Sequence, residues 1–163
     1  MLDALDEQPD LTVAVMGGAL LESALERLLV IQFTSKRKEL PGKLFENRGP
    51  MSDFNSKILI GEAFGVLRPK IADELQTIRH IRNTFAHARS PVTFETPQIS
   101  KEILGLQMLL IMQSVEVKGE HEETIRLFAS IKPRDAFLLI VRMLFLMIDE
   151  CCTKISGTSL VKG

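Results

Sequence analysis

The chain of 163 residues contains no tryptophan and no tyrosine, and it has only two cysteines, Cys151 and Cys152. Adjacent cysteines rarely bridge each other and no third cysteine is present to pair with, so a disulfide scaffold is excluded and a reducing compartment is indicated. No metal-site spacing such as C-x-x-C occurs. We therefore expect a cytoplasmic protein with no metal and no cofactor.

Basic charge is not in excess either. The chain has 20 lysines and arginines against 21 aspartates and glutamates, a formal net charge of -1. A domain that binds nucleic acid electrostatically usually carries a basic patch or stripe. The densest basic stretch, residues 36–38, is only three residues long and is predicted to be a solvated loop. This balance makes direct DNA binding unexpected.

Long hydrophobic runs are also missing. The first residues are acidic, whereas a secretory signal begins with basic residues followed by an apolar run. The longest apolar run near the end, residues 136–148, is interrupted by Arg142 and is too short to span a bilayer. The sequence therefore predicts a soluble protein with no membrane segment.

What is present is helical periodicity. The composition, 45% hydrophobic and 25% charged, is ordinary for a globular protein, and no sustained alternation of apolar and polar residues indicates strands. We predict an all-α, single-domain helical bundle of about five to seven helices spanning residues 1–163, with Asp10 as the first N-cap. The expected helices cover residues 11–33, 53–66, 69–88, 100–114, 121–130 and 133–154, and the tail at 156–163 is expected to fray.

Polar side chains that can carry chemistry gather near the end of the third predicted helix. Arg79, Asn83 and His87 share one helix face, because residues three or four apart are neighbours. Arg82 lies about a third of a turn away, towards the apolar stripe, where an arginine needs a carboxylate partner.

The first helix offers such carboxylates in Glu22 and Glu26. These two glutamates are four residues apart, and like charges at that spacing repel. An arginine placed between them would remove the repulsion. We hypothesise that Arg82 or Arg79 pairs with Glu22 or Glu26.

The same cluster can also be interpreted as the active site of a metal-independent ribonuclease. His87 would act as general acid or base, while Arg82 and Asn83 would hold the scissile phosphate. The alternative is structural: Arg82 and Asn83 cap or cross-link helices and His87 satisfies a helix C-terminus. The spacing alone favours the structural alternative. The remaining histidines, His80 and His121, are assigned to solvent or to helix caps.

Three segments, residues 49–58, 61–67 and 75–87, resemble the central pattern of the mannitol operon repressor (MltR) family. Its most specific part is I-R-N-x-F-A-H, which reads Ile81-Arg82-Asn83-Thr84-Phe85-Ala86-His87 here, and residues 20–29 are similar to the family's first helix. The resemblance covers roughly residues 10–115. It implies an all-helical, HEPN-like fold.

The resemblance also implies function. The family name implies transcriptional regulation, and we expect a homodimeric repressor that acts through a protein partner without sequence-specific DNA binding. Many members of the related HEPN superfamily are ribonucleases with an R-x(4–6)-H motif, often across a dimer interface. Arg82 and His87 fit that motif, so an RNA-cleaving enzyme using Arg82, Asn83 and His87 is the alternative.

Overall fold

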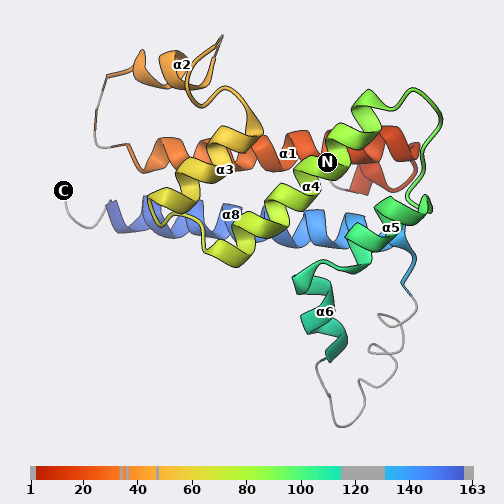
Figure 1. Cartoon of the computed structure of the whole chain (residues 1–163). Helices are drawn as coiled ribbons and strands as arrows, with labels where there is room; N and C mark the ends of the chain where they lie inside the picture. Colours follow the sequence, from red (N-terminus) through yellow and green to blue (C-terminus); the bar gives the residue numbers. More distant parts are fainter. Residues whose placement is uncertain (1–2, 34, 36, 47, 115–130, 160–163) are drawn as a thin grey trace.

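The computed structural model describes residues 3–33, 35, 37–46, 48–114 and 131–159, and over these residues it contains helices and no strand (Figure 1). The prediction of an all-α bundle is confirmed. The helices are η1 (Asp3–Leu5), α1 (Asp10–Ile31), α2 (Leu40–Phe45), α3 (Phe54–Ala63), α4 (Pro69–His87), α5 (Pro97–Leu104), α6 (Gln107–Ser114) and α8 (Pro133–Ser159).

Local capping explains where two of these helices begin. The Asp53 side chain accepts a hydrogen bond from the Ser56 backbone N–H at 3.0 Å and so caps α3. The Ser56 hydroxyl also donates a hydrogen bond to the Asp53 carboxylate. The two bonds, the hydroxyl bond most strongly, hold the pKa of the Asp53 carboxyl below its usual value. Pro69 starts α4, since proline lacks only an N–H that the first turn leaves unpaired.

The predicted N-cap at Asp10 is wrong. Asp10 is the first residue of α1, Pro9 occupies the N-cap position, and no side chain caps this helix. The Asp10 carboxylate instead accepts a hydrogen bond from the Phe94 backbone N–H at 3.0 Å and binds the Arg134 guanidinium. The Asp10 carboxylate therefore makes tertiary contacts in place of the N-cap hydrogen bond that local propensity predicts for it.

Several helix bounds also differ from the prediction. The single helix expected over residues 100–114 is divided into α5 and α6 by Gly105, a residue that costs a helix interior about 1 kcal/mol relative to alanine. The short helix α2 was not predicted, and α8 continues to Ser159, beyond the expected end at Lys154. The helix expected over residues 121–130 and the end of the tail lie outside the described residues.

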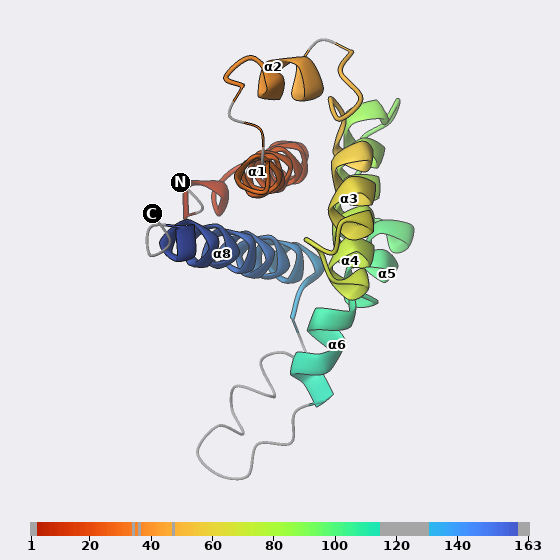
Figure 2. The same cartoon turned by 90° about the vertical axis from the view of Figure 1, so that its left-hand side faces the viewer.

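Helices α1 and α8 form the centre of the fold and run in the same direction. Their ion pairs show this, because Asp10 meets Arg134 near the start of both helices and Arg27 meets Asp149 at 3.6 Å further along. Helices α3 and α4 pack against α1 and lie to its right in Figure 2. The site described below lies where these helices meet α1.

Three phenylalanine rings pack in a row where the end of α4 meets α8. The Phe94 ring lies 4.9 Å, centroid to centroid, from Phe85 at the end of α4 and 4.9 Å from Phe137 on α8. All three phenylalanines are buried. Tilted ring pairs at this separation add about 0.5–1.5 kcal/mol each beyond the area they bury. The row fixes the end of α4, which carries His87, against α8.

Candidate functional site: a charge network between three helices

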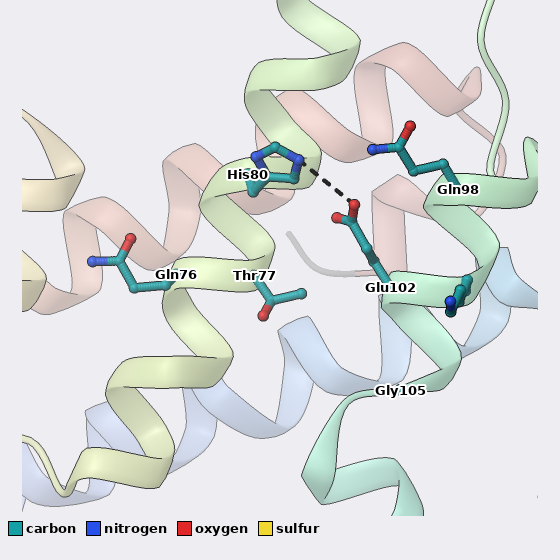
Figure 3. Close-up of a pocket in the computed structure, with 7 residues that line it drawn as sticks. Gln76, Thr77, His80, Gln98, Glu102 and Gly105 are labelled. Carbon is teal, nitrogen blue, oxygen red and sulfur yellow. Dashed lines mark ion pairs between the residues drawn. The ribbon is translucent and has the colours of Figure 1, made fainter.

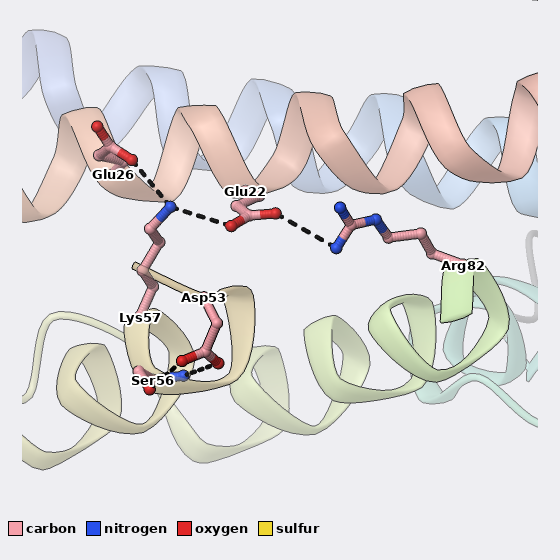
Figure 4. Close-up of polar contacts among 6 residues, drawn as sticks. All are labelled: Glu22, Glu26, Asp53, Ser56, Lys57 and Arg82. Carbon is pink, nitrogen blue, oxygen red and sulfur yellow. Dashed lines mark hydrogen bonds and ion pairs between the residues drawn. The ribbon is translucent and has the colours of Figure 1, made fainter. Parts of the chain in front are cut away.

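Four charged side chains from three helices form one connected network (Figure 4). Lys57 Nζ on α3 lies 2.8 Å from Glu26 Oε2 and 3.0 Å from Glu22 Oε1, both on α1. The second oxygen of Glu22, Oε2, lies 3.4 Å from Arg82 Nη1 on α4. Two cations thus balance two carboxylates, and the network joins α1 to both α3 and α4.

The hypothesis that an arginine pairs with Glu22 or Glu26 is correct, but the expectation that an arginine lies between the two glutamates is wrong. Arg82 reaches Glu22, but the cation that lies between Glu22 and Glu26 is Lys57. Arg79 contacts neither glutamate: its Nε donates a hydrogen bond to Gln76 Oε1 at 2.8 Å. Gln76 in turn donates to Asn55 on α3, so Arg79 supports the α3–α4 contact.

Lys57 is the most deeply buried cation of the network, with 4% of its surface exposed. Burial acts to lower the pKa of the Lys57 ammonium, but the hydrogen bonds and charges of Glu26 and Glu22 outweigh burial and raise that pKa above its usual value. Lys57 is therefore a fixed positive charge at neutral pH. A charge removed from water in this way needs both carboxylates.

A glycine on α1 makes room for Arg82. A Cβ built on Gly18 would lie 2.9 Å from Arg82 Cδ and 3.0 Å from its Cβ and Cγ, closer than real side chains approach. The adjacent Gly17 has the same function towards α8, where a Cβ would meet Phe137 at 3.2 Å. The glycine pair therefore permits α1 to pack closely on two neighbouring helices, and the Arg82 stem lies along α1.

The predicted catalytic residues do not converge within one chain. Arg82 and His87 are five positions apart on α4, which places them about 140° apart around the helix axis. His87 is the last residue of α4 and is exposed, and Asn83 is half-buried. Neither side chain makes a hydrogen bond or an ion pair with another residue that the structure describes, whereas the Arg82 guanidinium is paired with Glu22.

A second polar site lies between α4 and α5 (Figure 3). It is an open pocket of about 630 Å³ whose lining includes His80, Glu102, Gln76 and Gln98. His80 is exposed to solvent as predicted, and its Nε2 lies 3.6 Å from Glu102 Oε1, so it forms an ion pair when it is protonated. His121 lies outside the described residues.

Sequence reasoning missed two buried charged residues, Lys57 and Glu74. Glu74 on α4 is only 3% exposed, and its Oε1 accepts a hydrogen bond from the Met108 backbone N–H at 3.0 Å, in the first turn of α6. Its Oε2 is buried without a hydrogen-bond partner among the described residues. Burial raises the pKa of the Glu74 carboxyl, although the N–H groups of Met108 and Gln107 partly offset this.

The sequence contained a signal for Lys57. Phe54, Lys57, Ile58 and Gly61 recur at the spacing of one helix face, and all four are buried. A lysine on an otherwise apolar face needs a carboxylate partner, and the half-buried Glu22 and Glu26 supply it. For Glu74 no comparable signal exists, because its partner is a backbone N–H group more than thirty residues away.

Two absences hold for the described part of the chain. In it, no three histidine, cysteine, aspartate or glutamate side chains are grouped so that they could hold a metal ion. Likewise, none of its helices is both long enough and apolar enough to cross a membrane.

The fold and these contacts define an all-α protein whose central helix is tied to its neighbours by an arginine–glutamate–lysine network. The chain is similar in fold to a chain in the X-ray structure of the MtlR–HPr complex from Escherichia coli, with a TM-score of 0.69 and 15% sequence identity. The similarity covers 90% of this chain and 94% of that chain. No protein-family model and no curated protein sequence matches the chain.

Proposed function

We propose that this chain is a regulatory protein of the mannitol operon repressor type that acts in the cytoplasm by binding a protein partner. The observation that carries the proposal is the fold similarity over nearly the whole of both chains to a protein solved as an MtlR–HPr complex. The partner proposed for this chain is accordingly an HPr protein. We further propose that the regulator is a homodimer.

The charges support a protein partner over operator DNA. Basic and acidic residues are balanced, with a net charge of -1. Among the described residues, four arginines are already paired with carboxylates: Arg27, Arg82, Arg134 and Arg142. Arginines held in this way are not free to neutralise phosphates, which is the main source of affinity for DNA. The proposed repressor therefore works without direct, sequence-specific DNA contacts.

The ribonuclease using Arg82, Asn83 and His87 is the alternative function. For Arg82 to hold a scissile phosphate, its guanidinium would have to leave Glu22, which lies 3.4 Å away. His87 would have to meet an arginine that lies on another face of α4. Both requirements favour a regulatory function for the chain, with RNA as the second candidate ligand.

The test is a calorimetric titration of the purified chain with HPr from the same organism. We expect saturable 1:1 binding per protomer that survives 200 mM salt, and no shift of operator DNA at that salt. In parallel, wild type and the His87→Ala variant are incubated with mixed RNA in chelator. Absence of HPr binding together with RNA cleavage by wild type alone would overturn the regulator in favour of the enzyme.

A further inference from the structure

An apolar groove of about 720 Å³ lies at the opposite end of α1 from Asp10. Its walls are the end of α1, the turn between α3 and α4, and the second half of α8, which lie together on the left of Figure 1. The apolar lining includes Leu28, Val66, Leu67, Ile71, Met147 and Ile148. The groove is distinct from the charge network and from the His80 pocket.

Phe64, two residues before the groove residue Val66, is 76% exposed. It is the C-cap of α3, and the next residue, Gly65, has a φ of 69°, a conformation that favours glycine. The N–H groups of Val66 and Leu67 both donate to the Gly61 carbonyl, at 2.8 and 2.9 Å. These bonds fix the turn, so a large apolar side chain is held in water next to an apolar groove.

Opposite charges flank the same turn. Glu62 precedes Phe64, and Arg68 and Lys70 follow the groove residues Val66 and Leu67; all three charged side chains are exposed. None of the three pairs with another residue that the structure describes. The turn thus presents an acid, an exposed phenyl ring, an apolar groove and two cations within nine residues.

We propose that this face binds a second copy of the chain, with Phe64 of each protomer inserted into the groove of the other. In a two-fold dimer the same patch meets itself, so it must contain both a projection and its complement. Phe64 and the groove meet that requirement. The same rotation brings Glu62 of one protomer towards the cations at positions 68 and 70 of its partner, which gives the contact charge complementarity.

The proposal goes beyond HPr binding, because it assigns the surface through which the regulator associates with itself. A second copy fits better than an unrelated protein because both halves of the contact are on this chain. An exposed aromatic side chain inserted into a partner's pocket is the type of residue that dominates interface energy. The charges would then fix the register of the two protomers.

Sedimentation velocity of the full chain over a range of concentrations tests the proposal. We expect a dimer for wild type and at least a tenfold weaker dimer for Phe64→Ser. Leu11→Ser is the matched control, because Leu11 is also exposed but lies near the start of α1, and it should leave the dimer unchanged. Phe64 is exposed within the protomer, so the variant protomer should keep the helical circular-dichroism spectrum of wild type.

A charge exchange provides a second, independent readout. Glu62→Arg alone should weaken the dimer, and combining it with Arg68→Glu and Lys70→Glu should restore it. A dimer that tolerates both Phe64→Ser and Glu62→Arg would overturn the proposal. So would a monomeric wild type; if Phe64→Ser then abolished HPr binding, the groove would be assigned to HPr. A wild-type dimer that Phe64→Ser weakens but that does not bind HPr would support this surface and count against the proposed function.

Discussion

Lys57 on α3 lies with its Nζ 3.0 Å from Glu22 Oε1 on α1 and 2.8 Å from Glu26 Oε2, so one buried cation removes the repulsion between two carboxylates on the same helix. Glu22 uses its other oxygen for Arg82. The stability of α1 against α3 and α4 therefore depends on the lysine more than on the arginine, since Lys57 is buried and Arg82 is only half-buried.

The first prediction concerns the Lys57 charge. Lys57→Met keeps most of the apolar stem but leaves Glu22 and Glu26 without their shared cation. It should destabilise the fold by roughly 3 kcal/mol, the order of loss seen when one partner of a buried pair is removed. Urea unfolding measures the change. Adding Glu22→Gln and Glu26→Gln to Lys57→Met should recover most of the loss; no recovery would mean that the carboxylates are not the reason for it.

The second prediction concerns the close approach of Gly18 to Arg82. Gly18→Ala should destabilise wild type, because its Cβ would lie 2.9 Å from Arg82 Cδ. In an Arg82→Gly background, which also removes the Arg82 Cβ that would lie 3.0 Å away, the same substitution at position 18 should stabilise by about 1 kcal/mol, the helix propensity gained over glycine. Thermal unfolding of the four proteins in this cycle gives the sign in each background.

Gly17→Ala is the matched control for that cycle. Gly17 faces Phe137 and Val141 on α8 and does not approach Arg82, so its effect should be the same in both backgrounds. If Gly18→Ala has the same effect with and without Arg82, the Arg82 stem does not lie over α1 as the structure places it.

The sequence predicts the helices better than it predicts their contacts. Asp53 and Pro69 are local signals, and both start helices as expected. Asp10 carries the same kind of signal, but Phe94 and Arg134, which are distant in the sequence, determine its role. Local propensity cannot report such competition, because the competing groups come together only in the folded chain.

In the candidate site, too, the sequence predicts that a contact is needed but not which residue makes it. The need of Arg82 for a carboxylate follows from its position near the apolar stripe, and Glu22 meets that need. The bridging position between Glu22 and Glu26 could not be assigned from α4 alone, because Lys57 on α3 competes for it. Charge pairing predicts that a partner exists, whereas helix packing decides which one it is.

The third prediction is a pH dependence caused by Glu74. Burial raises the pKa of this carboxyl above its unfolded value of 4.5, so the folded chain holds the proton more tightly. The stabilisation is complete below the unfolded pKa and is lost as the pH rises through the folded pKa. Glu74→Gln should remove this decline, and urea unfolding between pH 4 and pH 8 should show a smaller loss of stability for the variant than for wild type.

Glu74→Ala distinguishes the effect of the Glu74 charge from the effect of its hydrogen bond to the start of α6. This variant lacks the acceptor for the Met108 N–H, and it should lose about 0.5–2 kcal/mol at every pH, as when a helix N-cap is removed. Parallel pH profiles for wild type and Glu74→Gln would show that the carboxyl does not titrate differently in the folded chain.

The fourth prediction concerns Arg134, which fixes the segment before α1 to the start of α8. Its Nη2 donates to the backbone carbonyls of Asp6 at 2.9 Å and Gln8 at 2.6 Å, while Nη1 binds the Asp10 carboxylate. A lysine has a single ammonium group and cannot place donors at this spread of acceptors. Arg134→Lys should therefore lose about 2 kcal/mol, the scale of a charged hydrogen bond.

Hydrogen exchange locates this loss. The amides of Gln8 and Val13, which donate to Leu5 and Pro9 carbonyls, should exchange faster in Arg134→Lys than in wild type, because the turn that they stabilise is no longer held against α8. Amides in α3 and α4, which Arg134 does not contact, serve as the internal control. Faster exchange spread evenly over all helices would show a global loss of stability and would contradict a local role for the Arg134 contacts.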